Sequence, residues 1–122
     1  MGNNFLFLKV IFANLIYSLA NKKGVDYQKV AEMVGFDPRI GHSHLQINHQ
    51  SGHSNKAGRG AGGHCFIKDM AALVEMFKEN DLNNKVDHLA VELLEKVVNF
   101  NKQLLIDSNK DLDLLQGVYG NK

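Results

Sequence analysis

The sequence predicts an all-α domain, and three observations support this. Four separate stretches place apolar residues three and four positions apart, which is the spacing of one face of a helix. No stretch alternates apolar and polar residues as a half-buried strand does, and no βαβ pattern is present. The chain has 122 residues, of which 44% are hydrophobic, enough for one compact core. We therefore expect one helical domain over residues 1–122.

The first predicted helix runs from Asn3 to Asn21 and is apolar on most sides. Between Phe5 and Ala20 only Lys9, Asn14 and Ser18 interrupt the apolar residues. Such a helix is expected to be buried against more than one neighbour or at a subunit interface. A secretory signal peptide or a membrane-anchored segment gives a similar pattern, but no positive side chain precedes the apolar run and a lysine interrupts it. We favour a buried helix that does not contact a membrane.

Three further helices are predicted by apolar stripes, and the first two of them begin at an aspartate whose side chain can cap a helix. They run from Asp26 to about Val34, from Asp69 to about Glu79, and from about Asn84 to Leu105. Residues 41–66 lose this periodicity and are rich in Gly, Ser, Asn and His, so we expect a long loop, which is usually functional or disordered. Residues from about 107 to 122 are expected to form a polar C-terminal tail.

The charge balance and the cysteine count exclude several classes of function. Fourteen Lys and Arg against thirteen Asp and Glu leave a net charge of +1, so nucleic acid and anionic membranes are not expected partners. The single cysteine excludes an intramolecular disulfide and fits a reducing compartment, so we expect a cytoplasmic protein.

One segment concentrates the chemistry: Gly-Arg-Gly-Ala-Gly-Gly-His-Cys-Phe-Ile-Lys-Asp at residues 58–69. Glycines let the backbone approach a ligand closely and present amide groups to it. Cys65 is expected a few residues before the start of the third helix, where free amides and Lys68 would stabilise a thiolate. The alternative is a small buried cysteine without reactivity.

This segment resembles the loop G-x-G-[aromatic]-G-G-x-C-[FIL]-P-K-D of the UDP-glucose/GDP-mannose dehydrogenase family. Residues 35–41, Gly-Phe-Asp-Pro-Arg-Ile-Gly, are similar to the family's G-x-D-x-R-I-G segment, and residues 9–14 resemble its long central helix. Nearly the whole chain is covered, so it looks like the family's central helical domain. Two positions differ: Ile67 replaces the usual proline and Ala61 the usual aromatic residue, so we expect a more flexible loop with a smaller substrate contact.

The resemblance implies a four-electron oxidation of a sugar C6 alcohol to a carboxylate, with two NAD molecules used in succession. Cys65 would attack the aldehyde-level intermediate, and hydride loss would leave a thioester for water to hydrolyse. Asp69 matches an aspartate that positions water and protons, although it could also be a plain helix cap. Asn3 matches a family asparagine that lies four residues after a catalytic lysine. That lysine would precede Met1.

The resemblance also implies where the nucleotide sugar binds. Arg39 matches an arginine that reaches across the dimer to the partner's sugar site, and the alternative is an exposed arginine in a turn. The other implied substrate-binding residues are Gly60, Gly62, Gly63, Phe66 and Lys68. Whether the nucleotide is UDP or GDP stays open.

NAD would be bound by the family's N-terminal domain, so no cofactor is expected in this chain, and the isolated chain is expected to be inactive. The apolar helix at residues 5–20 is expected to form a homodimer. A catalytically silent dimerisation module is therefore the alternative to a dehydrogenase whose N-terminal half is supplied elsewhere. No metal site is expected, because the five histidines of residues 41–66 lack paired ligand spacing and intervening carboxylates.

Overall fold

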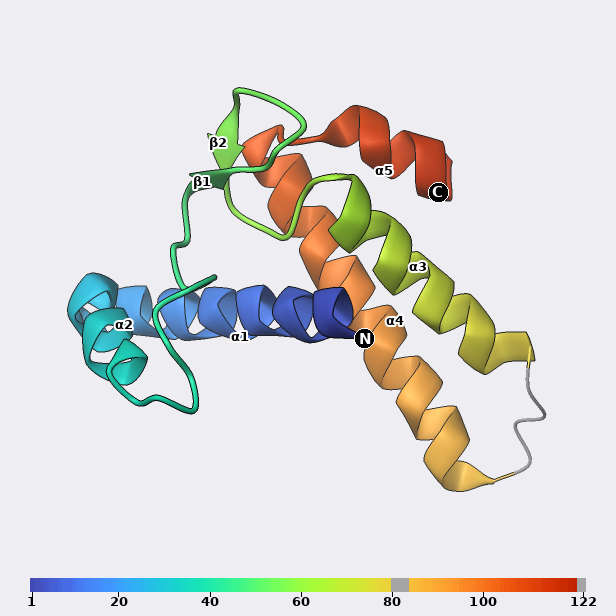
Figure 1. Cartoon of the computed structure of the whole chain (residues 1–122), viewed down its shortest axis with the longest axis horizontal. Helices are drawn as coiled ribbons and strands as arrows, with labels where there is room; N and C mark the ends of the chain where they lie inside the picture. Colours follow the sequence, from blue (N-terminus) through green and yellow to red (C-terminus); the bar gives the residue numbers. More distant parts are fainter. Residues whose placement is uncertain (80–83, 121–122) are drawn as a thin grey trace.

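The computed structural model describes residues 1–79 and 84–120, and its described part contains five helices and one pair of very short strands (Figure 1). The helices are α1 (Gly2–Lys23), α2 (Tyr27–Gly35), α3 (His64–Glu79), α4 (Lys85–Ser108) and α5 (Leu112–Tyr119). The strands β1 (His49–Gln50) and β2 (Ala57–Gly58) pair antiparallel within the long loop. The predicted all-α class is confirmed.

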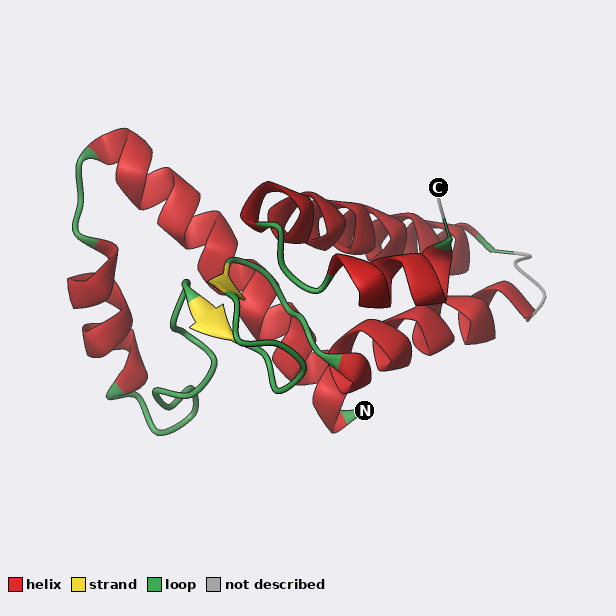
Figure 2. Cartoon of the chain, turned by 90° about the horizontal axis from the view of Figure 1, so that it is seen from above, coloured by secondary structure: helices red, strands yellow, loops and turns green. Residues whose placement is uncertain are grey.

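The helices form two arms that meet near the N-terminus of the chain. α3 and α4 run antiparallel and cross the first half of α1, while α2 folds back on the other end of α1 (Figures 1 and 2). α5 packs on α3 and on the end of α4. The long loop between α2 and α3 therefore returns from one arm to the other, and it delivers Cys65 to the junction.

Two clusters of buried side chains hold these arms together. The main core joins α1, α3 and α4 through Phe7, Val10, Ile11, Met70, Val74, Leu94, Val98 and Leu104, with Ala61 of the glycine-rich segment inside it. A second cluster joins α1 to α2 and to the long loop through Ala13, Ala20, Tyr27 and Ile47. The core therefore includes part of the candidate site, so loop and helices are packed as one unit.

α1 packs against α2, α3 and α4, as expected of a helix buried against more than one neighbour, but its opposite face is not covered within this chain. Five large apolar side chains of α1 stay exposed: Phe5, Leu8, Phe12, Leu15 and Leu19. By length and composition alone α1 could cross a membrane, but core helices pass the same test, and 33% of its apolar window is buried inside the fold.

The start of α3 differs from the predicted start of the third helix. α3 begins at His64, so Asp69 is not its cap, and that prediction was wrong. Gly63, with φ 86°, makes the turn into the helix, and the Ile67 N–H donates to the Gly63 carbonyl at 3.4 Å. Ile67 therefore lies inside the first turn of the helix, whereas we expected it to lie in a loosened loop.

The expected polar tail contains a helix. α5 occupies Leu112–Tyr119, and Leu115 packs in a third cluster with Ile67 of α3 and Leu105 of α4. The prediction of four helices was therefore wrong by one. The other predicted helices are confirmed, as is the cap at Asp26, whose side chain accepts the backbone N–H of Gln28. The Asn84 side chain caps α4 in the same way by accepting the backbone N–H of Asp87.

Candidate functional site

Cys65 lies in the first turn of α3 and not a few residues before the helix, so that prediction was wrong, and its side chain is exposed. A buried, inert cysteine is therefore not what this fold contains. The backbone N–H groups of a first helical turn have no partner within the helix, and they favour negative charge nearby. Cys65 is thus placed beside the free N–H groups of a helix start, where it can be reached from solvent.

Two of the other predicted catalytic residues meet one helical turn further on. The Asn3 side-chain amide, at the start of α1, donates to Asp69 Oδ2 at 2.9 Å, across 66 positions of sequence. Asp69 follows Cys65 by four residues, so the two side chains lie on one face of α3. The start of α1 and the start of α3 therefore assemble a thiol, a carboxylate and an amide at one place.

The predicted substrate-binding residues of α3 differ in their surroundings. Lys68 is exposed, whereas Phe66 is partly buried. The Phe66 ring packs edge-on against Phe7, with 6.5 Å between centroids, and lies 5.8 Å from the His44 ring. Phe66 therefore ties α3 to the core as well as bordering the exposed thiol.

Three of the glycines before Cys65 are required by contacts within the chain. A Cβ on Gly62 would collide with the Asp111 carboxylate, and a Cβ on Gly58 would come within 2.6 Å of Ser108 Cβ. Gly60 has φ 102°, and a Cβ there would lie 3.1 Å from Asn101 Oδ1. From the sequence we predicted that the backbone of these glycines contacts a ligand. Residues at the end of α4 and in the connection to α5 already explain why no larger residue fits at these positions. Substrate binding by Gly60, Gly62 and Gly63 stays a prediction.

Side chains near the end of α4 bind the backbone of this segment directly. The buried Asn101 accepts from the Ala61 N–H at 2.7 Å and donates to the Ala61 carbonyl at 3.0 Å. Ser108 Oγ accepts from the Arg59 N–H at 2.9 Å. The sequence analysis missed these residues, because nothing in their local pattern shows that they face a loop forty or more positions earlier.

Arg59 links the same glycine-rich segment to α1 through its side chain. Its guanidinium donates to Asn14 Oδ1 at 2.9 Å and to Ser18 Oγ at 3.1 Å, and it lies 4.8 Å from the centre of the Tyr17 ring. The polar residues Asn14 and Ser18 that interrupt the apolar run of α1 are thus used to bind Arg59. Their presence in an otherwise apolar helix has a structural explanation.

Arg39 lies apart from the thiol within this one chain. It pairs with Asp37 at 2.7 Å, is largely exposed, and lines an apolar groove between α1 and α2. Hydrogen bonds from Arg39 hold the pKa of Asp37 below its usual range. Lys9 Nζ fastens this turn to α1 by donating to the Ile40 carbonyl at 2.7 Å.

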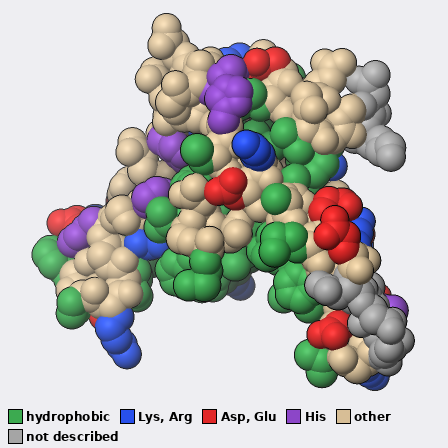
Figure 3. Space-filling view, turned by 45° about the vertical axis from the view of Figure 1, so that its right-hand side comes forward, with side chains coloured by type: hydrophobic (Ala, Val, Ile, Leu, Met, Phe, Trp, Pro, Cys, Tyr) green, Lys and Arg blue, Asp and Glu red, His purple; other side chains and the backbone are tan. Residues whose placement is uncertain are grey.

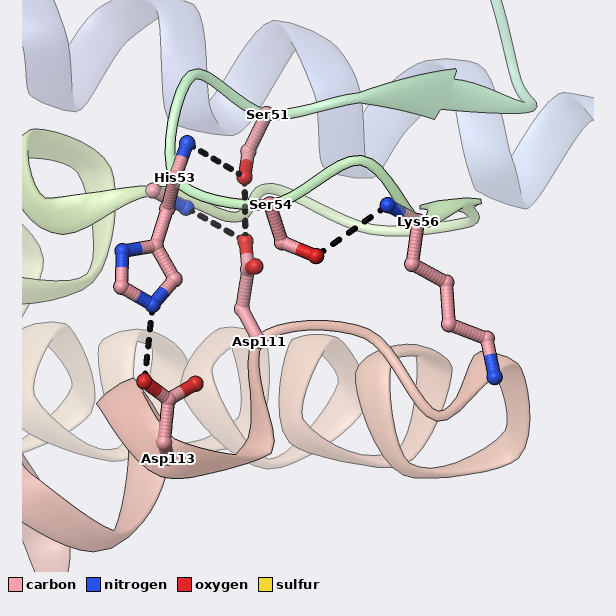
Figure 4. A network of polar contacts seen from close by, with 7 residues as sticks. Ser51, His53, Ser54, Lys56, Asp111 and Asp113 are labelled. Atoms are coloured by element: carbon pink, nitrogen blue, oxygen red, sulfur yellow. Dashed lines mark hydrogen bonds and ion pairs between the residues drawn. The ribbon is translucent and has the colours of Figure 1, made fainter.

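The histidines of the long loop make separate contacts. His53 Nε2 lies 2.7 Å from Asp113 Oδ2 (Figure 4). The His53 ring also packs edge-on against the His64 ring. His49 is half-buried near Lys110, and its pKa is lowered by burial and then by the positive charge of Lys110. Over residues 1–79 and 84–120, no three His, Cys, Asp or Glu side chains gather as metal ligands.

Lys110 gives a testable pH dependence. It is fully buried, and burial lowers its pKa from 10.5 to about 8, with the negative charge of Asp111 limiting the fall. Between these pH values the unfolded chain still holds a proton that the folded chain has released, so the free energy of unfolding should rise with pH, by at most about 3 kcal/mol. Urea unfolding from pH 7.5 to 9.5 should show this rise, and Lys110→Met should flatten it.

That pH range is chosen because burial raises the pKa of Tyr27 and of Tyr119 above 10, which acts in the opposite direction at higher pH. A wild-type unfolding free energy that falls between pH 7.5 and 9.5 would contradict the burial of a charged Lys110.

Comparison with known proteins gives one consistent family. The model described as the UDP-glucose/GDP-mannose dehydrogenase family, central domain, matches residues 1–103. UDP-glucose 6-dehydrogenase YwqF of Bacillus subtilis is 40% identical over 122 residues, which is 98% of this chain and 23% of the relative. UDP-glucose 6-dehydrogenase of Rickettsia bellii is 34% identical over 109 residues, which is 87% of this chain and 21% of the relative. The chain thus spans about a fifth of the length of the curated relatives it matches.

Proposed function

Because this chain belongs to the UDP-glucose/GDP-mannose dehydrogenase family, as its central domain, we propose that it supplies the nucleophilic thiol of an NAD-dependent UDP-glucose 6-dehydrogenase. One observation carries the proposal. Cys65 is exposed in the first turn of α3, and the hydrogen-bonded pair Asn3 and Asp69 lies one turn away. A thiol, a carboxylate and an amide at one surface are the groups that aldehyde capture and thioester hydrolysis require.

In the proposed reaction the Cys65 thiolate attacks C6 of the aldehyde-level intermediate and forms a carbon–sulfur bond. Loss of hydride from that adduct leaves a thioester on Cys65. Water then adds to the thioester carbonyl, the carbon–sulfur bond breaks with the Cys65 thiolate as leaving group, and the sugar carboxylate is released. Asp69 accepts a proton from the attacking water, and the Asn3 amide holds the Asp69 carboxylate in the orientation this needs.

NAD is the hydride acceptor in this reaction. We propose that NAD binds outside this chain. The two strands of the described part have two residues each and cannot form the strand–turn–helix that cradles a dinucleotide. Hydride transfer requires the nicotinamide to be held against the sugar. We therefore propose that the chain alone has no turnover. Separately, we propose that the complete enzyme is cytoplasmic, which its single cysteine fits.

We also propose that the chain forms a homodimer through α1. Apolar side chains of α1 and α2 line an open groove of about 400 Å³, among them Phe5, Leu8, Phe12, Ile16, Val30 and Val34. Hydrophobic side chains gather along the lower edge of the molecule in Figure 3, between the two arms. Arg39 borders this groove, so a partner bound there lies close to its guanidinium. That placement supports the role implied for Arg39 at the partner's sugar site.

The second candidate function is a dimerisation module without catalysis, which the same apolar groove favours. The two functions are separated by supplying the rest of the YwqF protein as a separate chain. With the proposed function, NADH forms from UDP-glucose only when both chains are present. If the two chains co-purify and no NADH forms, the silent module is the better description. NADH formation by this chain alone would contradict the placement of the NAD site.

A further inference from the structure

Asp111 binds the residue that starts the helix of Cys65. Its Oδ2 accepts the Gly63 N–H at 2.9 Å and the Ser51 hydroxyl at 2.6 Å (Figure 4). Gly63 directly precedes α3, and its carbonyl accepts the Ile67 N–H in the first turn of that helix. The position of Asp111 therefore fixes the first turn of α3, which contains Cys65.

Lys110 binds the other end of the same segment. Its Nζ donates to the carbonyls of Gly58 at 3.1 Å and of Gly60 at 3.0 Å. Two neighbouring residues of the α4–α5 connection thus hold residues 58–63 from both ends. Both residues lie beyond position 103, where the match to the family model ends.

Asp111 is held in a way that costs stability. It has φ 51°, which residues other than glycine adopt rarely, and it is only 5% exposed. Its second carboxylate oxygen, Oδ1, is buried and has no hydrogen-bond partner in the described part of the chain. A buried oxygen without a partner and a strained backbone are both unfavourable, and such features gather where a side chain has to be positioned for function.

We propose that Lys110 and Asp111 are positioning residues for Cys65, which set the reactivity of its thiol by fixing the glycine segment and the first turn of α3. This inference rests on the proposed role of Cys65 as a nucleophile. The first-turn N–H groups stabilise the thiolate only while that turn is formed. Because Cys65 is already exposed, loosening the turn cannot improve its access to reagents, so its reactivity at neutral pH falls.

The test is the rate of Cys65 alkylation by iodoacetamide on the full chain, followed by intact mass. Cys65 is the single cysteine, so one adduct reports it. At pH 7 we expect Asp111→Ala and Lys110→Met to slow alkylation about two- to fivefold, the range of the helix-terminus effect. At pH 10, where thiols are ionised regardless of their surroundings, the rates should match wild type. Asp111→Asn keeps an acceptor oxygen and should lie between wild type and Asp111→Ala.

The matched control is Val91→Ala, a buried change nearer the start of α4 that destabilises the same helix. If Val91→Ala slows alkylation at pH 7 as much as the two test variants, the effect is general destabilisation and the proposal is overturned. Wild-type rates at pH 7 in both test variants overturn it as well. If circular dichroism shows that Asp111→Ala does not fold, Lys110→Met and Asp111→Asn decide the question.

The alkylation test needs neither NAD nor the second chain, so it is independent of the dehydrogenase test. If alkylation slows as expected but the reconstituted pair of chains forms no NADH, the positioning role stands and the proposed reaction fails. If NADH formation depends on Cys65 but alkylation does not respond to Lys110 and Asp111, the positioning role alone fails.

Discussion

Replacing Cys65 with alanine in the reconstituted dehydrogenase should lower the rate of carboxylate formation by about a thousandfold or more. The expected loss is large because the thiolate forms a covalent bond to the substrate, and a methyl group offers no substitute for that bond. The exposed position of Cys65 in the first turn of α3 makes it available for this attack. Chromatographic quantification of the nucleotide-sugar acid formed from UDP-glucose measures the effect.

Binding of UDP-glucose by the Cys65→Ala pair of chains, followed by calorimetry, serves as the control for folding. The substitution removes one exposed atom and leaves the packing of Phe66 and Ile67 unchanged, so binding should be retained within about threefold. Carboxylate formation by Cys65→Ala above about a tenth of the wild-type rate would show that another group is the nucleophile.

The helices that could be predicted are those whose signals are local. α4 carries a long apolar stripe and a capping asparagine, and the predicted span from about Asn84 to Leu105 is close to the observed Lys85–Ser108. α5 is short, and it follows two charged residues, Lys110 and Asp111. The apolar periodicity fades after Ile106, which predicted a polar tail, and charged residues such as this pair are mostly exposed in proteins. Their burial depends on backbone groups of Gly58, Gly60 and Gly63, which lie some fifty positions earlier.

The candidate site could be predicted only in part, for the same reason. Cys65 could be predicted as the candidate nucleophile because the glycine-rich segment around it is a local sequence pattern. The contact between Asn3 and Asp69 joins positions 66 apart, and only the resemblance to a family grouped these two residues at one site. Reading Asp69 as a helix cap was wrong because α3 begins at His64, five residues before Asp69, after the turn made by Gly63.

Replacing Phe12 with glutamate should dissociate the proposed homodimer. Phe12 is 64% exposed in the single chain and lines the apolar groove between α1 and α2. An aromatic side chain at the centre of an interface contributes about 2 kcal/mol or more, and two-fold symmetry places the change on both subunits. The expected loss of about 4 kcal/mol raises the dimer dissociation constant about a thousandfold. Sedimentation velocity at micromolar concentration should therefore show a dimer for wild type and a monomer for Phe12→Glu.

Leu93→Glu is the matched control, because Leu93 is also 64% exposed but lies on α4, outside the groove. This variant should stay dimeric. A wild-type monomer at micromolar concentration, or dissociation caused equally by both variants, would refute the interface. Arg39 borders the groove that Phe12 lines, so a partner seated there meets the guanidinium directly. If Arg39 serves the partner's sugar site, Phe12→Glu should also abolish NADH formation by the reconstituted dehydrogenase, although Phe12 itself touches no reacting atom.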